Sequence, residues 1–132
     1  MTTANIVVAN IDKVAPVLLA PSYSSQFTTN QDVIVTITSA ENLAAPVGWI
    51  KTPNGSGFDY KKTYAANTVE AIIFSDTAGN NTIANITVNN IDKTPPVLLA
   101  AAYSTLATTS GPVAVTISSV ENLSAPAGWV KS

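Results

Sequence analysis

Hydrophobic and polar residues alternate along this chain in short stretches, and each stretch ends at residues that favour turns. A period of two places every second side chain on the same face, which is the pattern of a half-buried β-strand. This pattern, together with an apolar run that opens the series, predicts strands at residues 17–19, 32–38, 49–52, 58–62, 69–74 and 83–88. No stretch has the spacing of an amphipathic helix, since the best candidate, residues 41–45, is cut short by Pro46.

Turn-forming residues connect the expected strands. Residues 53–57 (PNGSG) carry the Asn-Gly signal of a β-hairpin, and residues 76–81 (DTAGNN) predict a second turn, because Gly and Asn tolerate a positive φ. Six or seven short strands about 8–12 residues apart indicate an all-β fold of the β-sandwich class. One face of these strands should fill the core, and the residues expected there are Val33, Val35, Ile37, Trp49, Ile73, Ile86 and Val88.

The chain also repeats itself after 80 residues. Residues 1–52 align without a gap onto residues 81–132, and 31 of these 52 positions are identical. A period of this length matches a small all-β domain and is too long for a solenoid repeat. The proline-containing stretch that begins at Ile11 and recurs at Ile91 is interpreted as the joint between domains, because proline cannot donate a hydrogen bond to a strand ladder.

This joint divides the sequence into three parts. Residues 1–10 are expected to be the last strand of a preceding repeat, residues 11–90 one complete domain, and residues 91–132 the first half of a second domain. Half a sandwich cannot close its own core. We therefore expect strand exchange between copies of the chain, with residues 91–132 pairing with one another, with the 1–10 strand of a neighbour, or both.

The composition excludes several classes of activity. The 132 residues include no Cys and no His, and the formal net charge is −2. Neither a thiol nucleophile nor an imidazole base or metal ligand is therefore available, and we expect no enzymatic activity. Nucleic-acid binding is not expected from a mildly acidic chain whose cations are all lysines. No run of 18 apolar residues exists, so membrane insertion is not expected either.

Two segments resemble a known family. Residues 75–96 (SDTAGNNTIANITVNNIDKTPP) resemble the end and joint of bacterial immunoglobulin-like repeats in large surface proteins, and residues 47–80 resemble the middle of the same module. The resemblance covers essentially the whole chain. It implies an immunoglobulin-like β-sandwich at the bacterial cell surface, flanked by similar repeats. Such modules are typically non-catalytic spacers or adhesin stalks, although a decoration domain of a phage or virion would share this fold.

Two kinds of binding site remain as candidates. Phe58, Tyr60 and Tyr64 could form a carbohydrate- or ligand-binding platform, which is the alternative function, and this reading requires that the three rings be exposed together. Asp12, Asp76 and Asp92 are weak calcium candidates, because joints between sandwich domains often bind this ion through oxygen ligands. Each joint offers a single carboxylate beside a lysine, so no bound cofactor is expected. Trp49 is expected in the core and not on a sugar-binding surface.

Overall fold

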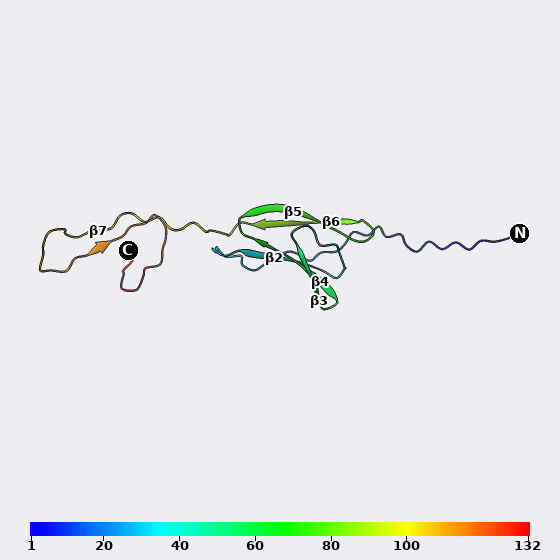
Figure 1. Cartoon of the computed structure of the whole chain (residues 1–132), viewed down its shortest axis with the longest axis horizontal. Coiled ribbons are helices and arrows are strands. Elements are labelled where there is room, and N and C mark those ends of the chain that lie inside the picture. The colour runs from blue at the N-terminus through cyan, green and yellow to red at the C-terminus, as the bar shows by residue number, and fades with distance from the viewer. The chain divides into compact units, whose positions relative to one another are not determined.

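The computed structural model describes all 132 residues, and it is an all-β structure without a helix (Figure 1). No helix is therefore available to cross a membrane. The chain divides into two compact units, which are called here the N-terminal unit (Met1–Lys93) and the C-terminal unit (Thr94–Ser132).

The N-terminal unit contains six strands in two antiparallel sheets. These strands are β1 (Ser22–Tyr23), β2 (Val33–Ser39), β3 (Ile50–Asn54), β4 (Gly57–Tyr64), β5 (Thr68–Ser75) and β6 (Asn81–Val88). The first sheet has the order β1-β2-β4-β3, and the second consists of β5 paired with β6. The hairpin and the turn predicted at residues 53–57 and 76–81 are both confirmed, because β3 pairs with β4 and β5 pairs with β6 across them.

The two sheets face each other over one hydrophobic core, and Figure 1 shows β5 and β6 as one layer and β2 and β4 as the other. Inward residues of β2, β4, β5 and β6 are all buried in the same cluster. The ring of Phe74 on β5 meets Tyr60 on β4 edge-on at 5.3 Å and Trp49 at 5.7 Å. These aromatic contacts join the layers and add to the burial of apolar area. The arrangement agrees with the predicted sandwich of antiparallel sheets.

The predicted core is confirmed at six of its seven positions and is wrong at Ile73, which is 55% exposed. Strand β5 contains three consecutive apolar residues, Ile72-Ile73-Phe74. The alternation therefore fits equally well whether Ile73 faces the core or Ile72 and Phe74 do. The structure turns Ile72 and Phe74 inward, because Phe74 fills the space between Trp49 and Tyr60. A shift of one residue moves a whole strand to the opposite face.

Two expected strands are also absent. Residues 17–19 form no strand, although the Leu19 N–H donates to the Thr38 carbonyl at 2.9 Å, and the short strand β1 follows them instead. Residues 1–10 likewise form no strand, and all of them are exposed. No strand of the two sheets of the N-terminal unit pairs with this segment.

The C-terminal unit contains one pair of two-residue strands, β7 (Ala102–Tyr103) and β8 (Val115–Thr116). The pairing of Tyr103 with Val115 matches that of Tyr23 with Val35, at an offset of 80 residues. Other hydrogen bonds recur at the same offset. The Ser39 hydroxyl donates to the Val17 carbonyl at 2.8 Å, as the Ser119 hydroxyl does to the Val97 carbonyl at 2.9 Å.

The division between the units falls after Lys93, whereas the sequence placed the start of the second repeat at residue 91. The Asn67 side chain binds both the N–H and the carbonyl of Ile91, which is buried in the first core. The Lys93 ammonium group lies 2.6 Å from the Asp32 carboxylate. Residues 91–93 therefore pack on the N-terminal unit.

Candidate functional site

The three aromatic residues proposed as a ligand platform do not form an exposed surface. Tyr60 is fully buried, and its hydroxyl accepts from the Leu43 N–H at 2.8 Å and donates to the Glu41 carbonyl at 3.1 Å. Burial raises the pKa of this phenol. Tyr64 is buried as well, while Phe58 is half-buried beneath the Lys51 ammonium group. The exposure on which the ligand-binding reading depends is therefore missing at two of the three rings.

Tyr64 belongs instead to a polar cluster that ties the two sheets together. Glu70 on β5 accepts a hydrogen bond from the Tyr64 hydroxyl and lies 2.8 Å from the Lys62 ammonium group on β4. Lys62 also lies over the Tyr64 ring, 4.9 Å from its centroid. The hydrogen bonds from Lys62 and Tyr64 lower the pKa of Glu70, while burial and the carboxylate raise the pKa of Tyr64. Each of the three side chains has a partner within the cluster, and the cluster joins β4 of one sheet to β5 of the other.

The three calcium candidates are not brought together. The Asp76 carboxylate accepts from the Asn80 side chain and from the N–H groups of Ala78 and Asn80, which caps the turn between β5 and β6 and lowers the pKa of Asp76. The Asp12 carboxylate accepts from the Val14 N–H. Asp92 lies at the other end of the unit, beside Thr29. No group of three or more carboxylates that could hold a metal ion exists in the structure.

The C-terminal unit has an exposed apolar surface, called here its open face, which includes Leu98, Ile117, Leu123 and Trp129. The residues on it have counterparts in the buried core of the N-terminal unit. Trp49 is 5% exposed and its counterpart Trp129 is 46% exposed, and the same comparison gives 0% for Ile37 and 40% for Ile117. In the N-terminal unit β4, β5 and β6 cover this face, whereas residues 94–132 contain no counterpart of these strands.

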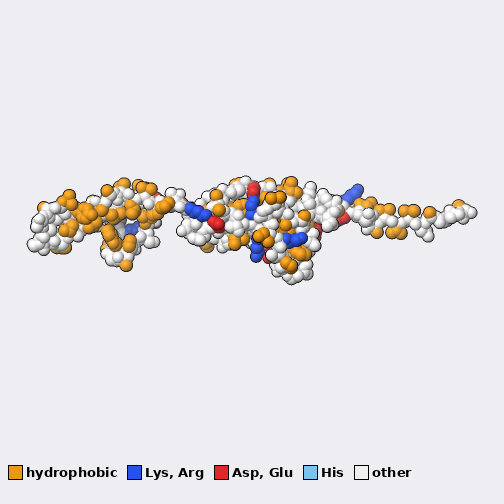
Figure 2. Space-filling view, viewed as in Figure 1, with side chains coloured by type: hydrophobic (Ala, Val, Ile, Leu, Met, Phe, Trp, Pro, Cys, Tyr) orange, Lys and Arg blue, Asp and Glu red, His pale blue; other side chains and the backbone are white.

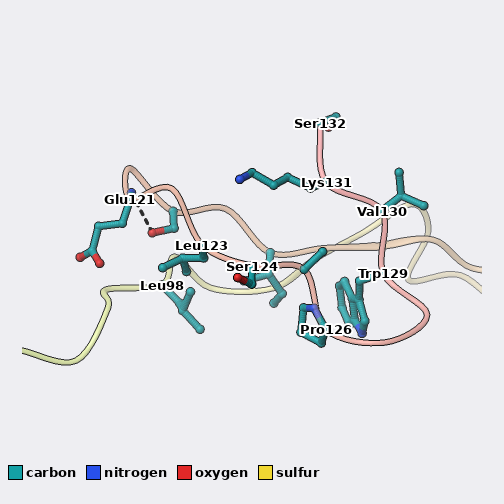
Figure 3. Close-up of a pocket in the computed structure, with 12 residues that line it drawn as sticks. Leu98, Glu121, Leu123, Ser124, Pro126, Trp129, Val130, Lys131 and Ser132 are labelled. Carbon is teal, nitrogen blue, oxygen red and sulfur yellow. Dashed lines mark hydrogen bonds between the residues drawn. The ribbon is translucent and has the colours of Figure 1, made fainter. Parts of the chain in front are cut away.

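The open face forms a hollow with a volume of about 460 Å³. Its apolar lining includes Leu98, Ile117, Leu123 and Trp129, and Figure 3 shows Trp129 beside Pro126, whose carbonyl accepts from the Trp129 N–H at 3.0 Å. Hydrophobic side chains gather over this unit and also along the exposed N-terminal segment in Figure 2.

The exposure of this surface could be predicted from the sequence repeat, and the structure shows which residues lie on it. The offset of 80 residues predicts which apolar residues lack cover, and Val113, Val115, Ile117 and Trp129 are exposed accordingly. The alternation of residues alone could not have separated these positions from Val33, Val35, Ile37 and Trp49, because the two sets have the same local pattern. Comparison of the chain with protein-family models, curated proteins and solved structures found no match.

Proposed function

We propose that this chain consists of immunoglobulin-like β-sandwich repeats from a tandem array, which act as a non-catalytic spacer or stalk in a bacterial cell-surface, adhesin-like protein. The observation that carries the proposal is the recurrence of residues 1–52 as residues 81–132. Hydrogen bonds that define the first copy recur in the second, including the contact of Glu41 with the Val17 N–H and that of Glu121 with the Val97 N–H. Repeated units that share one set of hydrogen bonds are suited to a modular rod.

The path of the chain through the N-terminal unit supports this role. Asp12 lies beside the turn that precedes β6, because its carbonyl accepts from the Asn80 side chain at 3.1 Å. Ile91 lies beyond the other end of β6, held by Asn67. The eight residues of β6 span about 26 Å at the rise of a strand. The chain thus enters the sandwich at one end and leaves it at the other, as a load-bearing spacer requires.

Surface location can be tested on cells that produce the protein. Antibodies raised against residues 11–93 should label intact cells, and mild proteolysis of intact cells should remove the label. A cytoplasmic protein probed in the same samples provides the control for lysis. Labelling that appears only after the cells are broken would overturn the assignment to the surface.

The mechanical part of the proposal can be tested by pulling on the purified chain through attachment points at residues 11 and 93. The two-layer core should unfold in one cooperative event, because force acts across both sheets at once. The gain in length should be roughly 260 Å, since 82 residues extend to about 3.6 Å each and the folded unit already spans a few tens of ångströms. Gradual extension without a force peak would contradict a role as a load-bearing module.

A further inference from the structure

The turn between β3 and β4 contains an asparagine that is followed by a glycine. Among all the asparagines of the chain, only Asn54 has this neighbour, which is Gly55. An asparagine loses its side-chain amide when the backbone nitrogen of the next residue attacks the carbonyl carbon of that amide. A side chain on the next residue hinders this approach, and glycine has none. Asn54 is therefore the asparagine of this chain that meets the least steric resistance to the reaction.

The structure leaves the attacking nitrogen free. Strand β3 lies at the edge of its sheet, and all of its residues, Ile50–Asn54, are exposed. Gly55 is exposed as well, and a Cβ built on it would have no other atom within 4 Å. The pairing of β3 with β4 ends with Asn54 and Gly57, and the Gly55 N–H donates no hydrogen bond within the chain. Neither packing nor a hydrogen bond therefore restrains this nitrogen.

The Asn54 amide has one hydrogen-bond partner, the carboxylate of Asp59 on β4. Its Nδ2 donates to Asp59 Oδ1 at 3.1 Å. The same carboxylate oxygen accepts from the Thr38 hydroxyl on β2 at 2.7 Å. The bonds from Thr38 and Asn54 lower the pKa of Asp59, so the carboxylate remains charged at neutral pH. A donor at position 54 is thus matched to a charged acceptor that joins the hairpin to β2.

We propose that Asn54 is a site of spontaneous deamidation, and that the reaction breaks the contact with Asp59. The Gly55 nitrogen bonds to Asn54 Cγ while the bond from Cγ to the amide nitrogen breaks. The proton of the Gly55 N–H passes through solvent to the departing nitrogen, which leaves as ammonia, and a five-membered succinimide remains. One water molecule then opens this ring at either carbonyl and gives an aspartate or an isoaspartate. The inference is independent of a role as a surface spacer.

Both products change the end of the hairpin. The aspartate places a carboxylate where the amide donated to Asp59, so a hydrogen bond is replaced by the repulsion of two like charges. The isoaspartate adds one atom to the main chain beside the pair of Asn54 and Gly57, which ends the β3-β4 ladder. The modified chain should therefore be less stable than the original one at neutral pH.

Ageing of the full 132-residue chain at mildly alkaline pH, without denaturant, tests the reaction. Trypsin cleaves after lysine and releases residues 52–61, in which Asn54 is the sole asparagine. The mass of this peptide should rise by the difference between an amide and a carboxylic acid. The peptide should also split into two chromatographic forms, one with aspartate and one with isoaspartate. The other asparagines should keep their amides over the same period.

Three variants separate the reaction from its consequence. Asn54→Gln should prevent the change in peptide 52–61, because a glutamine at this position would have to close a larger ring. Asn54→Asp reproduces one product and should unfold at a lower urea concentration than the unmodified chain at pH 7. This difference should shrink at pH 3, where a protonated carboxyl group donates in place of the amide.

The matched control is Asn30→Asp. The Asn30 side chain is exposed, and its oxygen accepts from the Gln31 side chain at 2.8 Å. The same charge is added there to a group that already serves as an acceptor, so stability should change less than in Asn54→Asp. The mass measurement on the unmodified chain does not depend on the folding of any variant.

Three outcomes would overturn the proposal. Another asparagine that loses its amide before Asn54 would show that the site lies elsewhere. A change in peptide 52–61 that occurs only when the chain is aged in urea would show that the folded hairpin shields Asn54. Equal effects of Asn54→Asp and Asn30→Asp on the urea midpoint at pH 7 would show that the contact with Asp59 is not what the reaction disrupts.

Discussion

The segments 33–49 and 113–129 have closely similar sequences and similar local bonding, yet they differ in burial. In both, the main chain folds back so that Ser24 or Ser104 accepts a hydrogen bond from the N–H ten residues further on. Gly48 and Gly128 have φ values of +84° and +83°. The apolar side chains of the first segment are sealed in a core, and those of the second are open to solvent.

The comparison separates the hydrogen bonds that residues 14–52 form by themselves from the burial that requires the rest of the domain. Hydrogen bonds within the first half of a repeat form in both units, because each unit contains both partners of every such bond. Burial of Val33 or Trp49 depends on strands that come later, from β4 to β6. The stability that a given residue contributes is therefore set by its partners in the fold, and matched substitutions at positions 80 residues apart measure that contribution directly.

The largest difference is expected for the two tryptophans. Trp49→Ala should destabilise the N-terminal unit by about 3–5 kcal/mol, the usual cost of emptying a large aromatic site in a core. Trp129→Ala should leave the unfolding of that unit unchanged, because residue 129 belongs to the other compact unit. Urea unfolding followed by far-ultraviolet circular dichroism measures both, and equal losses would refute the assignment of Trp49 to the core.

A conservative variant sharpens this test. The indole nitrogen of Trp49 is buried without a hydrogen-bond partner. Trp49→Phe keeps the aromatic contact with Phe74 and gives up no hydrogen bond, so it should cost much less than Trp49→Ala. A loss as large as that of alanine would mean that the indole N–H makes an interaction that the geometry does not contain.

The serine pair should show a smaller difference. Ser39 is 1% exposed, and its hydroxyl binds the Val17 carbonyl and the Glu41 N–H. Ser39→Ala removes two hydrogen bonds of a buried side chain and should cost about 1–3 kcal/mol, at about 0.5–1.5 kcal/mol for each bond. Ser119 makes the equivalent bonds on an exposed surface, where water replaces the lost hydroxyl, so Ser119→Ala should change stability by about 0.5 kcal/mol or less. A thermal melt of each variant checks the contrast.

Much of the fold could be predicted from the sequence, because strand alternation and turn residues are local signals. The hairpin at residues 53–57 illustrates the limit. Asn54 pairs with Gly57, so the two-residue loop is Gly55-Ser56 and not Asn-Gly, and Gly55 takes the positive φ of +60°. The face of β5 could not be predicted from Ile72-Ile73-Phe74, since only packing against Trp49 and Tyr60 from other strands selects it.

The candidate sites show the same limit. Tyr60 and Phe58 lie two residues apart on β4, yet Tyr60 is the central buried ring and Phe58 lies at the margin. The partners of Tyr60, the N–H of Leu43 and the carbonyl of Glu41, come from a loop whose path has no periodic signal. The open face of the C-terminal unit could be predicted because the repeat supplies an internal reference for what is missing there.

The smallest effect concerns Glu70, which joins the two sheets and for which residues 94–132 have no counterpart. Its hydrogen bonds to Lys62 and Tyr64 lower its pKa in the folded state below the ordinary value of 4.5. The folded state therefore binds fewer protons, and the stabilisation is complete above about pH 4.5 and is lost as the pH falls through the lowered pKa. Because the pair is partly exposed, the contribution should be below about 1 kcal/mol.

Glu70→Gln tests this effect, since glutamine keeps an oxygen that accepts from Lys62 and Tyr64 but cannot titrate. The difference in urea stability between pH 7 and pH 3 should be smaller in Glu70→Gln than in the unmodified chain. Asp76→Asn provides the matched control, because its turn lies on an exposed loop away from the Lys62–Tyr64–Glu70 cluster and its own lowered pKa contributes separately. An acid response that is unchanged by Glu70→Gln but reduced by Asp76→Asn would place the acid sensitivity of the N-terminal unit in the turn before β6, and would mean that the ion pair between Lys62 and Glu70 adds no measurable stability.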